Sequence, residues 1–332
     1  MGIKLSALEA ATAEKGRTAA DALRAVGELV PRLEELGYRR LWFAEHHGSE
    51  WATSVVPAVL TAHFAALTSD IRLGSGGVMA PNHAPRAVAE QFATLGALHP
   101  DRIDLGIGRG PGTHDPGIVR DLRRGAGPPT DADYRADVAA LLRLLTGRER
   151  LISGPLGPVD VEPWLLSSSP AGARLAAELG LPLAFAHHIR PDHTAAALTV
   201  YREEFTASRW RQEPYVMLCV ETLVAETDER AAELAVPVDH GKVSLLAGRG
   251  EAALLPPAEA ATRQIPRDVL PQILGHTATQ VRGGVETAQR RFTEIAGQTG
   301  ADELMLFVPL YDPADRIRSF ELAVTATQAL TG

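Results

Sequence analysis

Short apolar runs alternate with longer amphipathic stretches along most of the chain, and this alternation restricts the possible folds more than any other feature. Runs of this length and composition are typical of parallel strands that are buried on both faces. The sequence contains eight of them: IKLSAL (3–8), RRLWFA (39–44), IRLGSGGVM (71–79), RIDLGIG (102–108), VEPWLLS (161–167), LPLAFA (181–186), PYVMLCVETLVA (214–225) and ELMLFVPL (303–310).

The stretches between these runs carry helical patterns with recognisable ends. Ser169 followed by Pro170 has the pattern of a helix cap and first turn, and Gly180 is placed to end that helix. Thr277 with Gln280 fits a capping box that would begin another helix.

Eight such units in 332 residues predict an α/β fold, a TIM (β/α)8 barrel. We expect it to form a single domain over residues 1–332, with loop insertions at about 109–130 and 240–270. A doubly wound sheet is the alternative, but it usually has fewer strands and a phosphate loop near the N-terminus.

The composition narrows the choice of partners and compartment. The net charge is −8, which disfavours nucleic acid as the main partner. The single cysteine, Cys219, lies in an apolar run and cannot form an internal disulfide, which favours a reducing, cytoplasmic location. The first ten residues lack a signal-peptide pattern, and no apolar run approaches the roughly 20 residues that span a bilayer. We therefore expect no membrane partner.

The stretch LWFAEHHGSEW (41–51) brings Glu45 and two histidines to the end of a predicted strand, and ELGLPLAFAHH (178–188) repeats the pattern. Because the carboxyl ends of barrel strands face one side, where active sites form, both histidine pairs should lie at one end of the barrel. A metal site is disfavoured, because adjacent strand residues such as His46 and His47 point to opposite faces. We predict no metal.

Three further strand ends suit a phosphate or a flat ligand. They are the serine run 167–169 before a helix, the turn LGIGRGPG (105–112) with Arg109, and GSGGVMAPNHAP (74–85) with bare glycine backbone. A plain N-cap, a tight turn and a strand bulge are the ordinary alternatives. A planar phosphorylated ligand fits all three, and both flavin mononucleotide (FMN) and a phosphosugar meet that description.

Together, blocks of sequence along the whole chain resemble the bacterial luciferase-like flavin-dependent monooxygenases, including a subgroup with polyketide-tailoring enzymes. The blocks are YRRLWFAEHH (38–47), RLGSGGVMAPNHAPRAVAEQFATL (72–95), PDRIDLGIGRGPGT (100–113), PWLLSSSPAGARLAAELGLPLAFAHH (163–188) and TGADELML (299–306). The resemblance implies a TIM barrel, usually a homodimer, that binds reduced FMN supplied by a separate flavin reductase. Oxygen would add to the flavin C4a carbon, and the resulting peroxide would oxygenate a small organic substrate, with aromatic polyketides of antibiotic biosynthesis as one expected class.

The resemblance also assigns roles to single residues. His46 would lie near the flavin and transfer a proton, with Glu45 as its orienting neighbour. Gly76 and Gly77 would form a cis peptide against the flavin ring. The phosphate site would comprise Arg109, Ser168, Ser169 and Gly172, and the rim of the substrate pocket would include Trp51, His83, His187 and His188.

At two positions the sequence differs from the luciferases, so not all properties of the luciferases are expected here. Gly108 stands where they have a cysteine beside the flavin, and Ser168 replaces an acidic residue, so oxidation of long-chain aldehydes and light emission are not expected. Two alternatives stay open: a hydride-transfer oxidoreductase that uses the deazaflavin F420, and a non-catalytic flavin-binding barrel.

Overall fold

Eight parallel strands close into a barrel in the computed structural model, which describes residues 3–147, 159–246 and 252–328. The strands of the ring are β1 (Lys4–Glu9), β2 (Arg40–Phe43), β3 (Arg72–Met79), β4 (Ile103–Gly108), β5 (Glu162–Ser167), β6 (Leu183–Phe185), β7 (Val216–Val224) and β9 (Glu303–Phe307). Strands β1 to β7 follow each other in chain order, and β9 closes the ring between β7 and β1. The predicted TIM barrel and its eight strands are confirmed, with strand ends that differ by at most three residues.

One further strand, β8 (Val281–Gly283), pairs with Thr222–Val224 at the carboxyl end of β7. The capping box expected at Thr277 and Gln280 is wrong. Thr277 is the last residue of helix α10 (Leu270–Thr277), where its hydroxyl donates to the carbonyl of Ile273 at 3.0 Å. Gln280 leads into β8 instead of a helix.

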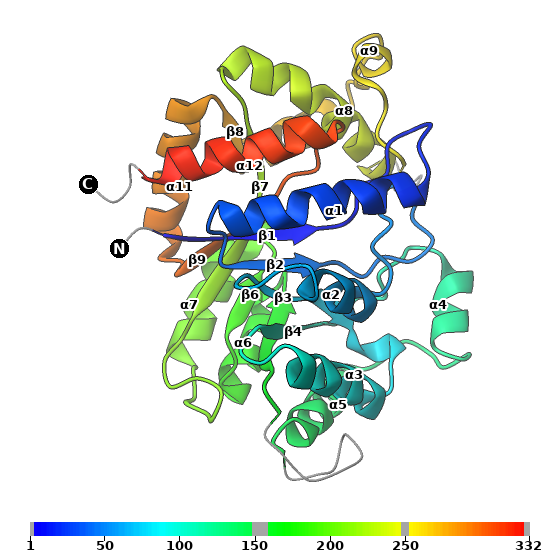
Figure 1. Ribbon diagram of the computed structural model, residues 1–332, viewed down its shortest axis with the longest axis vertical. Helices are drawn as coiled ribbons and strands as arrows, with labels where there is room; N and C mark the ends of the chain where they lie inside the picture. Colours follow the sequence, from blue (N-terminus) through cyan, green and yellow to red (C-terminus); the bar gives the residue numbers. More distant parts are fainter. Residues whose placement is uncertain (1–2, 148–158, 247–251, 329–332) are drawn as a thin grey trace.

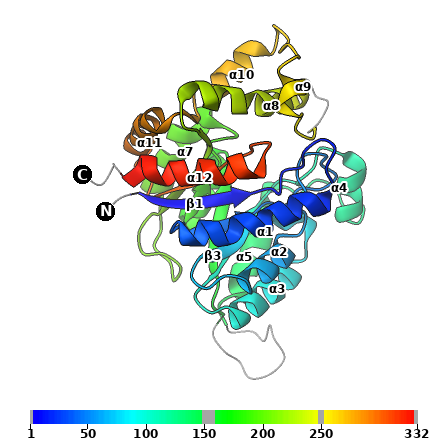
Figure 2. The same ribbon diagram turned by 45° about the horizontal axis from the view of Figure 1, so that its top comes forward.

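Helices surround the barrel (Figures 1 and 2). Besides α10 they are α1 (Ala19–Glu35), α2 (Pro57–Ala65), α3 (Pro85–Leu98), α4 (Pro116–Leu122), α5 (Asp131–Leu144), α6 (Pro170–Leu179), α7 (Thr194–Glu203), α8 (Asp228–Leu246), α9 (Pro257–Ala260), α11 (Val285–Thr299) and α12 (Pro313–Gln328), with short 3₁₀ turns η1 (Ala80–Asn82) and η2 (Pro191–His193). None of the described helices combines the length and apolar composition needed to cross a bilayer.

The two expected insertions contain helical structure. Helix α4 lies within 109–130, and α8 continues to Leu246, past the expected start of the second insertion at 240. Residues 247–251 of that insertion lie outside the described residues. In Figure 1, β1 points toward the side of the molecule where α4 and α9 lie, so both insertions are at the carboxyl end of the barrel.

The sequence sets the ends of α6 as predicted. Ser169 accepts a hydrogen bond from the N–H of Gly172, Pro170 is the first helical residue, and Gly180 ends the helix with a left-handed φ of 62°. Gly180 suits this position because a side chain there would be strained. Helix α6 therefore starts directly after β5, which places the serine run at the carboxyl end of the barrel.

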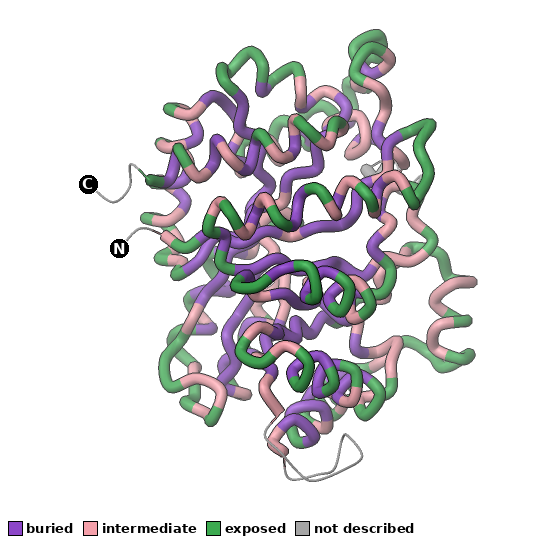
Figure 3. The backbone as a smooth tube through the Cα atoms, in the orientation of Figure 1, coloured by how far each residue is buried: buried purple, intermediate pink, exposed green. Residues whose placement is uncertain are grey.

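Apolar side chains fill two separate layers. Leu41, Phe43 and Leu73 point outward and pack against the helices, whereas Trp42 and Trp164 lie inside the barrel. The inner cluster also includes Met217, Cys219 and Met305. Cys219 is buried, as its apolar surroundings predicted. Figure 3 shows the strands as a buried centre beneath helices whose outer faces are exposed.

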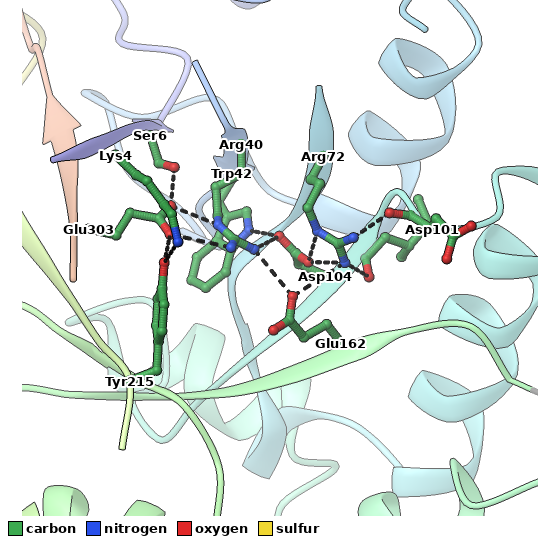
Figure 4. A network of polar contacts seen from close by, with 11 residues as sticks. Lys4, Ser6, Arg40, Trp42, Arg72, Asp101, Asp104, Glu162, Tyr215 and Glu303 are labelled. Carbon is green, nitrogen blue, oxygen red and sulfur yellow. Dashed lines mark hydrogen bonds and ion pairs between the residues drawn. The ribbon is translucent and has the colours of Figure 1, made fainter. Parts of the chain in front are cut away.

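A buried network of charges closes the amino end of the barrel (Figure 4). Arg40 lies between Asp104 and Glu303, with nitrogen–oxygen distances of 2.7 and 2.8 Å, and all three side chains are at most 2% exposed. Arg72 also binds Asp104 at 2.6 Å, and Glu162 lies 3.5 Å from both arginines. Because these charges come from the first or second residues of five strands, the network holds the amino ends of those strands in register.

Candidate active site

The residues that follow β2 continue the alternation of the strand. Arg40 lies in the interior charge network, Trp42 packs on Trp164 inside the barrel, and Ala44 joins an apolar cluster at the carboxyl end. The same period of two places His46 on the interior side, above these residues. His46 is therefore positioned by the strand that the sequence analysis predicted.

An aromatic row crosses the carboxyl end of the barrel beside His46. The ring of His46 lies 5.9 Å from that of Trp51, Trp51 lies 5.7 Å from Phe307 of β9, and Phe307 lies 5.6 Å from His188 after β6. Segments far apart in the sequence thus bring three of the predicted residues, His46, Trp51 and His188, to one place.

Glu45 faces the other way, toward the end of β3. Its Oε1 accepts hydrogen bonds from Nε2 of His83 (2.8 Å) and of His47 (3.0 Å), and its Oε2 accepts from the Met79 N–H (3.1 Å). Burial alone would raise the pKa of Glu45, but these hydrogen bonds hold the pKa below its ordinary value of 4.5. Glu45 was predicted to orient His46, and the bonds described for its carboxylate come from His83, His47 and Met79.

His187 and His188, the second histidine pair, also contact different parts of the structure. Nδ1 of His187 lies 2.7 Å from the hydroxyl of Thr194 at the start of α7. His188 is half-buried, and loss of contact with water at its ring lowers its pKa from 6.5 to about 4, which the hydrogen bond with the Cys219 carbonyl offsets only in part. The positive charge of Lys242 lowers this pKa further. His188 is therefore neutral at neutral pH, and it can accept or donate one hydrogen bond but does not add charge.

The peptide bond between Gly76 and Gly77 is cis, and it lies inside the barrel on β3. A Cβ on Gly76 would come within 2.6 Å of Leu8 and 3.0 Å of Trp42, and one on Gly77 would come within 2.8 Å of the Gly106 carbonyl oxygen. Neither position has room for a side chain. The glycines thus keep bare backbone at the level where the barrel opens.

Arg109 directly follows β4, and it lies among polar groups of α5. Its guanidinium forms an ion pair with Asp131 and lies 5.8 Å from the ring centre of Tyr134. The hydroxyl of Tyr134 is buried and has no hydrogen-bond partner among the described residues. A buried hydroxyl without a partner costs free energy, so a ligand oxygen beside Arg109 would relieve it.

The serine run lies next to this corner, because β4 and β5 are paired up to Ile107 and Leu165. Ser169 Oγ caps α6 by accepting from the Gly172 N–H at 3.3 Å, and the Ser168 carbonyl accepts from Nδ1 of His193 at 3.1 Å. Ser169 is thus an ordinary N-cap of helix α6. Ser168 and the start of α6 still face the end of β4, where the helix dipole favours an anion.

These observations fit the ligand that the resemblance implies. A cation, a buried hydroxyl without a partner and a helix start can hold a phosphate. The glycine pair supplies close backbone for a flat ring system, and His46 follows the neighbouring strand, β2. Among the described residues, no group of three His, Cys, Asp or Glu side chains is placed to hold a metal ion.

A cavity of about 560 Å³ lies at the opposite, amino end, lined by residues that include Lys4, Tyr38, Arg39 and Thr327. A second, of about 350 Å³, lies between Pro81 and α5 and is lined by residues that include Arg123 and Asp137. We do not assign catalysis to the larger one, because TIM-barrel active sites form at the carboxyl end.

Sequence reasoning missed several residues at this end: Tyr134, Phe307, Glu221, Lys242 and Gln280. Glu221 carried a signal, since it is the one acidic residue in the run PYVMLCVETLVA. Tyr134 lies in a helix beyond the stretch that was expected to be a loop, and nothing in its local pattern distinguishes it from a core residue.

The fold and this site define a TIM-barrel oxidoreductase. The chain belongs to the luciferase-like monooxygenase family, whose model matches residues 5–294. It is 39% identical over 320 residues to the uncharacterised protein YvbT of Bacillus subtilis, covering 96% of this chain and 95% of the relative. It is 36% identical to a luciferase-like monooxygenase of Escherichia coli, covering 99% and 98%. The crystal structure of apo-MsnO8 superposes with a TM-score of 0.90 at 33% identity, covering 98% of each chain.

More distant solved structures share the fold alone. They include the oxygenating constituent of 3,6-diketocamphane monooxygenase of Pseudomonas putida in complex with FMN (TM-score 0.73, 18% identity, 98% of each chain). They also include an F420-dependent secondary alcohol dehydrogenase (TM-score 0.68, 13% identity, 98% of this chain and 99% of the other).

Proposed function

We propose that this protein is the oxygenase of a two-component system that uses reduced FMN, delivered by a separate flavin reductase, and O2 to oxygenate a small organic molecule. The observation that carries the proposal is the arrangement at the carboxyl end of the barrel. Arg109 and His46 directly follow β4 and β2, and the bare peptide at Gly76 and Gly77 lies within β3 between them. Tyr134 of α5 completes the anion corner at Arg109. Membership of the luciferase-like monooxygenase family supports the same activity.

Each part of the site would have a distinct task. Arg109, Tyr134 and Ser168 would hold the phosphate, and the Gly76–Gly77 backbone would lie against the flat ring system. When bound, FMN supplies the reaction with oxygen, which no side chain can perform. His46 would hold or deliver a proton at its ring nitrogen, since an imidazole changes charge near neutral pH. Trp51 and Phe307 would exclude water from this side of the site.

The proposal is tested by stopped-flow mixing of the protein and reduced FMN with dissolved oxygen. We expect a transient absorbance that differs from those of free reduced and free oxidised FMN. His46→Ala should leave FMN affinity within about twofold and slow product formation by about 10²-fold or more, the usual scale of general acid–base catalysis. Failure of the wild-type protein to bind reduced FMN would remove the proposal.

The two alternatives give other results. An F420-dependent enzyme would bind reduced F420 and oxidise it with a carbonyl or alcohol substrate in the absence of oxygen. A non-catalytic barrel would bind oxidised FMN tightly and give no transient. The position of His46 on the interior side favours an enzyme over a passive binding protein.

We also propose a homodimer formed through α2. This helix is apolar on most sides, and Val55, Val56, Val59 and Leu67 at and beside it are 39%, 48%, 63% and 61% exposed. Exposed apolar residues that lie together mark an interface. Sedimentation velocity should give a dimer for the wild-type protein and a monomer for Val59→Asp. Leu274→Asp, on the exposed face of α10, is the matched control and should stay dimeric.

A further inference from the structure

Three side chains form a row across β8, β7 and β9 at the carboxyl end of the barrel. Glu221 and Phe307 are register partners in the parallel pairing of β7 with β9. Thr222 of β7 and Val281 of β8 are also register partners. Gln280 precedes Val281 just as Glu221 precedes Thr222, so Gln280 lies beside Glu221. Register partners in parallel strands point to the same face, so all three side chains lie on the side where Phe307 contacts Trp51 and His188.

The polar members of this row are buried and bonded to each other and to α8. Oε1 of Glu221 accepts from Lys242 Nζ at 2.6 Å and from Gln280 Nε2 at 3.0 Å. Glu221 is 5% exposed and Gln280 is 4% exposed. Because a carboxylate can only accept hydrogen bonds, the contact fixes the orientation of the Gln280 amide: its nitrogen faces Glu221 and its oxygen faces away.

This orientation leaves hydrogen-bonding groups without partners. Oε1 of Gln280 is buried and has no partner among the described residues. Lys242 has three N–H groups, and the contacts that the structure describes for it use Oε1 of Glu221 alone. A buried acceptor such as Gln280 Oε1 is costly in a protein that never satisfies it. The Lys242 side chain is 19% exposed, and its spare N–H groups remain available beside the same carboxylate.

The cluster lies next to the residues of the proposed active site. Phe307 joins the row to Trp51 and, through Trp51, to His46. The charge of Lys242 is close enough to lower the pKa of His188, whose ring lies against Phe307. The row therefore lies on the side of the proposed site that is away from Arg109. A substrate would lie on this side.

The ion pair alone could serve to fasten α8 to β7, but that role needs neither Gln280 Oε1 nor the spare donors of Lys242. A secondary amide complements both. Its carbonyl oxygen accepts from the Lys242 ammonium, and its N–H donates to Gln280 Oε1.

We propose that Lys242 and Gln280 are specificity-determining residues that bind a secondary amide of the substrate, held in place by Glu221. The inference rests on the proposed function for its location in the substrate side of the site. The substrate class is then small organic molecules with an amide N–H. The residues proposed to bind the cofactor do not determine this class.

Isothermal titration calorimetry with two probes of equal length tests it: N-hexylacetamide, which has the amide N–H, and hexyl acetate, which has an ester oxygen in its place. The wild-type protein should bind the amide at least about tenfold more tightly, because the ester leaves Gln280 Oε1 unpaired. Gln280→Met should reduce this ratio to within about twofold. Lys242→Met should weaken both probes by about fivefold or more and keep the ratio, because both probes have a carbonyl oxygen.

Gln272→Leu, on the exposed face of α10, is the control and should bind both probes as the wild-type protein does. Equal binding of the two probes by the wild-type protein, or no binding of either, overturns the inference without recourse to any variant. An unchanged ratio in folded Gln280→Met also overturns it. The titrations are run with and without FMN, so that a failure of FMN binding contradicts the proposed function while the probe ratio still tests this inference.

Discussion

The carboxylate of Glu45 accepts a hydrogen bond of 2.8 Å from the imidazole of His83, which joins the end of β2 to the turn after β3. The pKa of Glu45 is lowered by this bond and by the bond from His47, although burial opposes the shift. A carboxyl whose pKa is lower in the folded protein stabilises the fold above its unfolded pKa, and this stability is lost as the pH falls through the folded pKa.

We therefore expect Glu45→Gln to lower the free energy of unfolding at pH 7 by about 1–3 kcal/mol. The difference from the wild-type protein should shrink as the pH falls below 4.5, the ordinary carboxyl value. Urea unfolding over a series of pH values measures it, with Glu35→Gln, a 63% exposed carboxylate on α1, as the control. A difference that stays constant with pH would show that ionisation of Glu45 is not its source.

His188 gives a second pH dependence, in a higher range. Its pKa falls from 6.5 to about 4 in the folded protein, chiefly because the ring is shielded from water there. The unfolded chain therefore binds a proton that the folded chain does not, and stability contributed by His188 is present above pH 6.5 and lost as the pH falls toward 4.

His188→Gln should remove this effect. Between pH 7.5 and pH 5 the wild-type protein should lose roughly 1–2 kcal/mol more of unfolding free energy than the variant, at about 1.4 kcal/mol for each pKa unit. Urea unfolding at the two pH values measures the difference. The same substitution at His63, which is exposed on α2, should leave the wild-type slope unchanged. Parallel slopes for His188→Gln and the wild-type protein would contradict the assigned burial.

The sequence predicted the barrel well because its strands are buried on both faces. Runs such as IDLGIG in β4 are buried over their whole length, apolar except for Asp104, and have no competing helical period. β8 was missed for the opposite reason: its three residues, VRG, are too few for a period, and Thr277 and Gln280 matched a helix start by chance. Pairing with β7 makes this segment a strand, and the local sequence pattern contains no information about that pairing.

Strand ends could be placed from the sequence, but contacts among them could not. The gathering of His46, Trp51 and His188 follows from the rule that all barrel strands point the same way. The bond of Glu45 with His83 depends on the turn after β3, and Lys242 and Gln280 lie in a stretch without a clear period. Such contacts are set by how loops close over the barrel, which no residue spacing encodes.

At the phosphate corner, Arg109→Ala should weaken FMN binding by about 10- to 100-fold, because a charged hydrogen-bond donor to phosphate is lost. Riboflavin, which has no phosphate, should bind both proteins equally within about twofold. Tyr134→Phe should weaken FMN by a few fold and leave riboflavin unchanged, and it should not destabilise the protein without ligand, because the hydroxyl has no partner there.

Fluorescence titration with the two flavins measures these affinities. Arg135→Ala removes an exposed arginine of α5 that pairs with Glu178, and it serves as the matched control. Equal loss of FMN and riboflavin affinity in Arg109→Ala would indicate a disturbed fold and would remove Arg109 from the phosphate site.

The adjacent arginines Arg39 and Arg40 provide the sharpest test of the network at the amino end. Arg40 is 2% exposed and binds two carboxylates that are not exposed at all, whereas Arg39 is exposed. Burial alone would lower the pKa of Arg40, but Asp104 and Glu303 raise it, so the guanidinium stays charged. Arg40→Met would leave Glu303 buried without its cation, and it would leave Asp104 with Arg72 alone.

We expect Arg40→Met to reduce the free energy of unfolding by about 3–5 kcal/mol, the usual cost of removing one partner of a buried ion pair. Arg39→Met, the same change one residue earlier, should cost less than about 0.5 kcal/mol. Because protonation of the stranded carboxylates would relieve Arg40→Met, its deficit should be smaller at pH 4 than at pH 7, as measured by urea unfolding. A deficit of the same size in both variants would mean that β2 tolerates the loss of any arginine equally, and that the buried network does not hold the strands.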